Sequence, residues 1–67
     1  MRVLIQDVQS KKYFNEREWV KDAREGANFV SHRLAYSVAR HSGVAEFNIV
    51  LYSPIGGYLF SVDHGRN

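Results

Sequence analysis

The chain has 67 residues, of which 45% are hydrophobic and 24% are charged, and its formal net charge is +2. This composition excludes a disordered tail, because enough apolar side chains are present to offset the entropy of ordering a domain. The lack of cysteine excludes a disulfide framework and a thiolate metal site, and so small a net charge does not by itself indicate a nucleic-acid partner. We therefore expect one ordered domain over residues 1–67.

The N-terminal segment predicts a β-hairpin. Residues Arg2 to Val8 (RVLIQDV) begin as an aliphatic, β-branched run and end in polar residues, and Gln9 to Lys11 supply a turn before Tyr13 and Phe14. The run of three apolar residues before Gln6 is too short for a signal peptide or a membrane span. We therefore expect a cytoplasmic protein without membrane contact.

The segment from residue 16 to residue 41 allows two interpretations. One continuous helix would carry a narrow apolar seam of residues spaced three and four apart: Val20, Ala23, Ala27, Val30 and Leu34. In that helix Phe29 would point away from the seam, whereas a break between Gly26 and Val30 would let its ring turn inward. We favour the broken version.

The principal helix is then expected from Ser31 to His41. Ser31 is a good N-cap residue, and Gly43 stops the helix. Asp22, followed by Glu25 three residues later, is expected to cap a single preceding turn.

The C-terminal segment FNIVLYSPIGGYLFSVD predicts a second hairpin. Its two apolar runs flank Pro54-Ile55-Gly56-Gly57, in which proline presets the backbone for a turn and a following glycine takes the left-handed conformation. The order strand, strand, helix, strand, strand predicts a small α+β domain with one helix packed on one face of an antiparallel sheet. The apolar strands Val3–Ile5 and Phe47–Ser53 are expected at the centre and shorter strands at the edges, in the order 2-1-3-4.

The helical repeat of 100° per residue divides the principal helix into two faces. One set of side chains is expected to face the sheet: Leu34, Ala35, Val38 and Ala39. The opposite set is expected to face outward: Arg33, Tyr36, Ser37 and Arg40.

Several positions, mostly of core type, form a pattern over the first two thirds of the chain: VLIQDV, Tyr13, Trp19, Asp22-Ala23, Phe29, Ser31, Ala35 and Ala39. This pattern resembles short bacterial proteins of unassigned function, which are built as a hairpin, a tryptophan, an alanine and a phenylalanine before a short helix, and closing strands. The resemblance implies an α+β fold with a broken helix. It implies no functional residue, because those proteins have no assigned activity to carry over.

No catalytic, metal or cofactor site is predicted. His32 and His41 are nine residues apart, which places them on opposite sides of a helix and prevents them from chelating one ion. No nucleophile motif accompanies the pair Asp63-His64, and the spacing around Gly56-Gly57 is that of a hairpin turn rather than of a phosphate-binding loop. We therefore expect a protein that is not an enzyme.

The leading hypothesis is an interaction domain that acts through protein contact, with a copy of itself as the first partner considered. One helix covers only one face of a sheet, whereas the strand from Phe47 to Tyr52 offers apolar side chains to both. Val50 and Tyr52 would then belong to an uncovered apolar patch on the second face. We expect this patch to bind a second copy in a dimer, with a heterologous protein as the other partner considered.

The second hypothesis is binding of RNA or single-stranded nucleic acid, and it is not favoured. It depends on the outward face of the helix, where a tyrosine lies between two arginines, and on a pair of lysines in the first hairpin: Arg33, Tyr36, Arg40, Lys11 and Lys12. Arginine contacts phosphate and tyrosine stacks on bases. The same arginines are also explained as charges that solubilise an exposed helix face.

Overall fold

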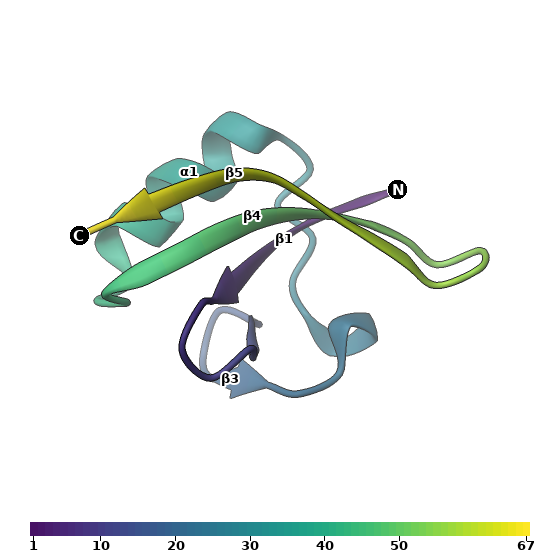
Figure 1. Ribbon diagram of the computed structural model, residues 1–67, viewed down its shortest axis with the longest axis horizontal. Coiled ribbons are helices and arrows are strands. Elements are labelled where there is room, and N and C mark those ends of the chain that lie inside the picture. Colours follow the sequence, from purple (N-terminus) through teal and green to yellow (C-terminus); the bar gives the residue numbers. More distant parts are fainter.

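Five strands form one antiparallel sheet in the computed structural model, which describes all residues from Met1 to Asn67 (Figure 1). The strands, in chain order, are β1 (Arg2–Asp7), β2 (Tyr13–Phe14), β3 (Trp19–Val20), β4 (Glu46–Ser53) and β5 (Tyr58–Arg66). Their order across the sheet is β3-β2-β1-β4-β5. One α-helix, α1 (His32–His41), and one 3-10 turn, η1 (Ala23–Glu25), complete the fold, which confirms the predicted α+β class.

Strand β3 is absent from the predicted order of elements, so the observed order is β-β-β-α-β-β rather than β-β-α-β-β. It pairs with β2 at the edge of the sheet, outside the four predicted strands. A tight turn makes this pairing possible, because the side-chain Oδ1 of Asn15 accepts hydrogen bonds from the backbone N–H groups of Arg17 and Glu18. A strand of two residues is too short to show a period of two in the sequence.

The predicted helix break is confirmed, and both predicted caps are present. Asp22 accepts a hydrogen bond from the backbone N–H of Arg24 at the start of η1. Ser31 Oγ accepts one from the backbone N–H of Leu34 at the start of α1, at 3.0 Å. These side chains satisfy N–H groups that the first turn of a helix leaves without partners.

The segment between η1 and α1 is held against β1. Phe29 N donates to Val3 O at 2.9 Å, and Val3 N donates to Asn28 Oδ1 at 3.0 Å. These bonds satisfy both backbone groups of Val3, on the side of β1 where the short strand β2 does not reach. They also turn Phe29 inward, where its side chain is buried.

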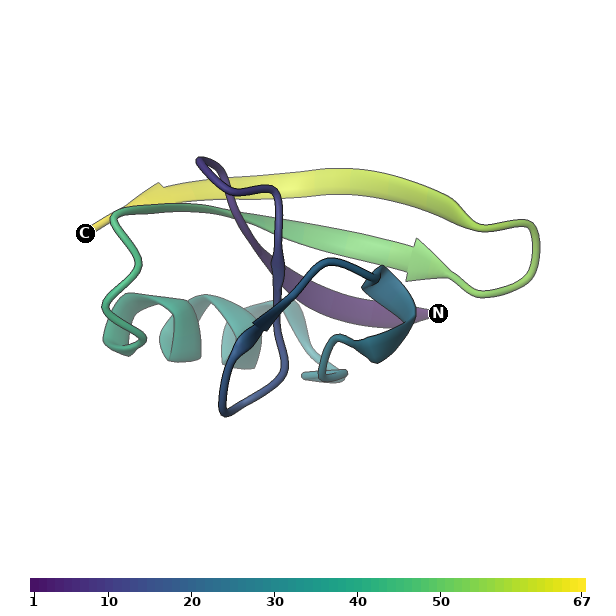
Figure 2. The ribbon, with the colours of Figure 1, turned by 90° about the horizontal axis from the view of Figure 1, so that it is seen from below.

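The main core lies between α1 and the sheet, which form two layers (Figure 2). It is built from seven buried residues: Val3, Ile5, Phe29, Ala35, Ala39, Phe47 and Ile49. Gly65 of β5 lies directly opposite Phe47 of β4, and a Cβ atom at position 65 would lie only 2.4 Å from Cζ of the phenylalanine ring. The missing side chain of Gly65 therefore gives the Phe47 ring its space.

A second, smaller core lies on the opposite face of the sheet, because successive residues of a strand face opposite sides. It consists of Leu4, Tyr13, Val50 and Tyr52. Val20 and Ala23 pack against this cluster, so the segment from β2 to η1 covers the face that the helix does not. Val50 and Tyr52 are 3% and 6% exposed, and the predicted uncovered patch at these two residues is therefore wrong.

The helices of the structure do not combine the length and apolar character that a membrane span requires.

Candidate functional site

The outer face of α1 differs from the predicted one at two positions. Tyr36 is half-buried, and its ring packs edge-on against Phe47 with a centroid distance of 5.2 Å, so its predicted outward orientation is wrong. Leu34 is 52% exposed, so its predicted inward orientation is also wrong. The helix faces the sheet with Ala35 and Ala39, whose small side chains let it approach closely, and Val38 and Tyr36 also pack against the core.

The remaining residues of the predicted nucleic-acid site lie on two separate segments. Arg33 and Arg40 are exposed on α1 and take part in no ion pair. Lys11 and Lys12 belong to the turn between β1 and β2, which the Asp7 carboxylate organises by accepting hydrogen bonds from residues 9 and 10. The tyrosine expected between the two arginines packs its ring against Phe47 and is only partly exposed.

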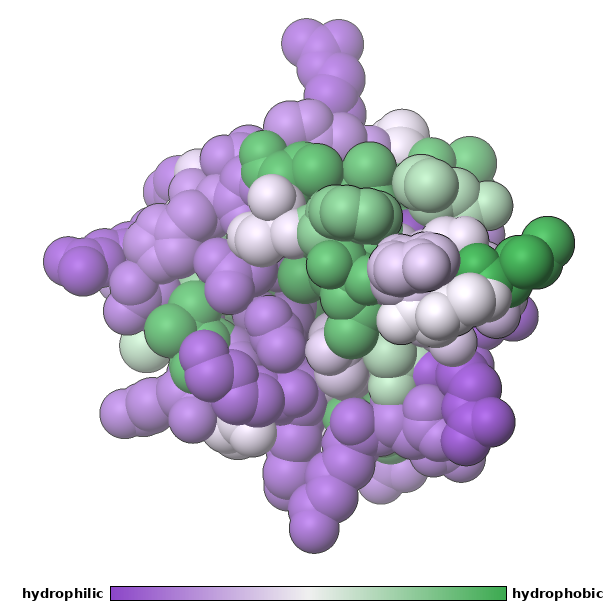
Figure 3. All heavy atoms as spheres, turned by 45° about the vertical axis from the view of Figure 1, so that its right-hand side comes forward, coloured by the Kyte–Doolittle hydropathy of each residue, from purple (hydrophilic) through white to green (hydrophobic).

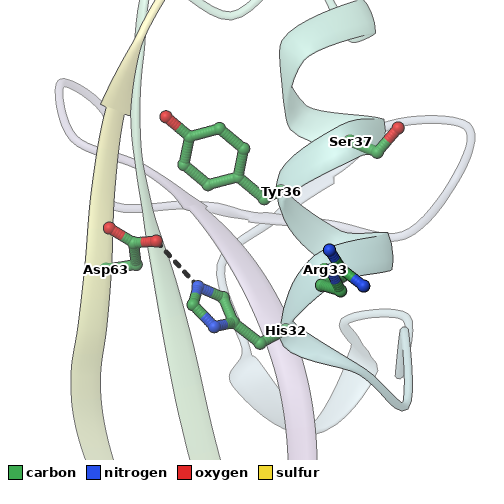
Figure 4. A pocket seen from close by; sticks show the side chains of 5 residues that line it. All are labelled: His32, Arg33, Tyr36, Ser37 and Asp63. Carbon is green, nitrogen blue, oxygen red and sulfur yellow. Dashed lines mark hydrogen bonds and ion pairs between the residues drawn. The ribbon is translucent and has the colours of Figure 1, made fainter.

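An open pocket of about 340 Å³ lies between α1 and β5. Its lining contains one aromatic and four polar or charged side chains: His32, Arg33, Tyr36, Ser37 and Asp63 (Figure 4). Figure 4 shows the imidazole of His32 and the ring of Tyr36 directed from the helix towards β5, with Ser37 directed away. The hydroxyl of Ser37 is therefore not placed to be activated by the imidazole.

The central contact of this pocket joins His32 to Asp63. Nε2 of His32 lies 2.7 Å from Oδ2 of Asp63, which fixes the first turn of α1 to β5. The hydrogen bond from His32, assisted by the backbone N–H of His64, lowers the pKa of the Asp63 carboxyl. Both side chains of the pair are partly exposed, so the contact is accessible to water.

His64 takes part in a different contact on the other face of the sheet. Its Nε2 bonds to Oε2 of Glu46, and Arg66 approaches the same carboxylate at 3.5 Å. The bond from His64, followed by the charge of Arg66, lowers the pKa of Glu46. Neighbouring residues of a strand face opposite sides, so the side chains of Asp63 and His64 serve two separate ion pairs.

Strand β5 carries a surface that the sequence does not single out. Strand β5 is nine residues long, and it pairs with β4 on one side only. Four large apolar side chains of β5, which we call the β5 edge surface, are 45–63% exposed: Tyr58, Leu59, Phe60 and Val62. Ile55, at the tip of the β4–β5 hairpin, is 89% exposed. The side of the molecule that carries this tip shows a cluster of apolar side chains surrounded by hydrophilic ones (Figure 3).

No family model, curated protein or solved structure matches the chain.

Proposed function

We propose that this protein is a small, non-enzymatic interaction domain that acts through protein contact along the β5 edge surface. The observation that carries the proposal is the exposure of four large apolar side chains on a strand that has a neighbour on one side only. An edge strand offers free backbone N–H and C=O groups to a partner strand, and apolar side chains beside them add contact area. Together these features fit a protein partner.

The two edges of the sheet differ in a way that supports this proposal. The opposite edge, β3, has only two residues and follows the charged run Glu16, Arg17 and Glu18. Short edge strands and charged neighbours hinder pairing with other chains. From Tyr58 to Val62, strand β5 has neither charge nor proline, and within this segment only the bulge at Val62 hinders pairing; the charged residues Asp63 and Arg66 lie further along the strand. The surface left open is therefore the one best suited to pairing.

Nucleic-acid binding remains the alternative proposal, and the exposed, unpaired Arg33 and Arg40 favour it. Nucleic-acid binding has less support than protein contact, because the Tyr36 ring packs against Phe47 and is less available to stack on a base. Two arginines without a stacking side chain provide phosphate contacts only. Protein contact accounts for more of the exposed surface.

Site-specific photo-crosslinking tests the proposal. Phe60 is replaced by the photoreactive analogue benzoylphenylalanine, and the protein is irradiated in lysate of the cells that make it. We expect protein adducts that resist nuclease and are absent from a matched variant with the analogue at Lys21, an exposed residue close to β3. Failure to form any protein adduct from position 60, or adducts that nuclease removes, would refute action through protein contact at β5.

A further inference from the structure

The backbone of β5 directs specific groups to its open edge. Val8 N donates to Glu46 O, and Asn67 N donates to Ala45 O, so residues of β4 alternate between bonding to β1 and bonding to β5. The odd-numbered residues of β4 therefore bond to β5. Since Leu51 pairs with Phe60 and Ser53 with Tyr58, the N–H and C=O groups of these two β5 residues point to β4. The backbone N–H and C=O groups of Leu59 and Ser61 therefore point away from β4, towards the open edge of the sheet.

We propose that the partner of β5 is the β5 strand of a second copy of this chain, paired antiparallel about a two-fold axis at Phe60. This inference rests on the proposed function and names its partner. Leu59 of each copy lies opposite Ser61 of the other, where the outward backbone groups of both residues can bond. Phe60 lies opposite its own copy, and Tyr58 lies opposite Val62. The two sheets then join into one continuous sheet that carries both helices on the same face.

The side chains of this register are complementary to themselves. Tyr58 and Phe60 face the same side of β5 and stack with a centroid distance of 6.4 Å, so two copies bring four aromatic rings together. Aromatic pairs across neighbouring strands are favourable contacts. Leu59 adds an apolar contact on the other face of the joined sheet.

Charge also favours a second copy in this register. A two-fold axis brings identical segments together, so a charged centre would oppose like charges. The segment from Tyr58 to Val62 contains no charged residue, and Asp63 would lie opposite Gly57, which has no side chain. The net charge of +2 adds little repulsion between two copies.

The area of contact sets the strength to expect. Covering most of the β5 edge surface in both copies buries on the order of 1,000 Å² in total, which is near the lower limit for a specific interface. We therefore expect a dimer that forms at micromolar concentration rather than an obligate one.

Sedimentation equilibrium of the purified full chain tests the association. We expect twice the monomer mass at concentrations of about 100 µM and dissociation on dilution. Phe60→Lys places two like charges at the axis and should weaken association at least tenfold, whereas Ile55→Lys, with the same charge change outside the paired segment, should change it by less than about twofold. Circular dichroism checks that both variants fold.

Engineered disulfides test the register, because the natural chain has no cysteine. Residues that face each other in a pair without backbone hydrogen bonds have Cα atoms about 4.5 Å apart, which suits a disulfide. Phe60→Cys should therefore oxidise rapidly to a linked dimer. Tyr58 is similarly exposed but lies two residues from the axis in each copy. The two sulfurs of Tyr58→Cys would therefore be separated by roughly 13 Å along the strands, and this variant should not form a linked dimer. Equal rates of linkage at the two positions would overturn this register.

The outcomes separate the partner from the proposed function. A wild-type chain that stays monomeric to millimolar concentration, while its photoreactive variant at position 60 forms an adduct with another protein, overturns the second copy and leaves the function standing. A monomeric chain without any protein adduct overturns both.

Discussion

Replacement of Gly65 by alanine should destabilise the protein through a single steric conflict. The added Cβ atom would lie 2.4 Å from Cζ of Phe47 and 2.9 Å from two further ring atoms, all much closer than real contacts of a Cβ atom. The ring is fully buried beneath α1 and held at its side by Tyr36, so it has little freedom to move away. Overpacking of this kind costs about 1–3 kcal/mol.

A second effect of the same substitution has the opposite sign. Alanine restricts the unfolded chain more than glycine does, which stabilises a folded protein by about 0.4–1 kcal/mol at a compatible position. The steric term is larger, so we expect the free energy of unfolding of Gly65→Ala to fall by about 1–2 kcal/mol. Such a loss is large for a chain of this size, whose total stability is about 3–10 kcal/mol.

Urea unfolding in a double-mutant cycle measures the conflict directly. Phe47→Leu removes the ring atoms that the new Cβ would strike, at a cost of its own in lost packing. The two changes together should cost at least about 1 kcal/mol less than the sum of the single changes. Additive effects, or an unchanged unfolding midpoint for Gly65→Ala alone, would refute the close approach of β5 to the Phe47 ring.

Three further predictions concern the helix, the ion pairs and the segment between η1 and α1. Leu34→Asp should stay folded and lose less than about 1 kcal/mol of stability, because the Leu34 side chain is half exposed. Ile49→Asp should unfold the protein, because it buries an unpaired charge. Thermal melts compare the two variants. Hydrogen bonds to histidine lower the pKa values of Asp63 and Glu46 in the folded state. The stability that these two carboxylates contribute is therefore present above the ordinary carboxyl pKa and is lost as the pH falls through their folded pKa values. Urea midpoints should therefore drop below about pH 4, and the double variant Asp63→Asn and Glu46→Gln should show a smaller drop. Asn28→Ala removes an acceptor from two backbone N–H groups and should cost about 1 kcal/mol, measured by urea unfolding, while Asn28→Asp should retain most of the stability.

The parts of the fold that local chemistry decides could be predicted from the sequence. The caps at Asp22 and Ser31 depend on residues within three positions, and both are observed. The hairpin turn at Gly56-Gly57 depends on two residues that tolerate positive φ, and both adopt it. The central strands were recognisable because β1 and β4 are apolar on both faces.

The parts that depend on distant contacts could not be predicted in the same way. Tyr36 faces the core because its ring packs against Phe47, which lies eleven positions later in the chain. Val50 and Tyr52 are buried because Val20 and Ala23 pack over them, and no local pattern connects these segments. The sequence predicted the last strand at an edge of the sheet but not the exposure of its side chains, because consecutive apolar residues in a strand indicate burial.

The β5 edge surface is exposed because the other elements of the chain pack elsewhere. The segment from β2 to α1 pairs with the edge of β1 and packs over the smaller core on the second face of the sheet. It also supplies α1, which packs on the main core. None of these elements pairs with β5. The chain that follows α1 contains β4, β5 and the hairpin between them, with Asn67 bonded to the end of the helix by its side chain. Within residues 1–67, no segment pairs with the outer edge of β5. Pairing along that edge requires another strand, and the second copy that we propose would supply one in the register that the uncharged residues around Phe60 favour.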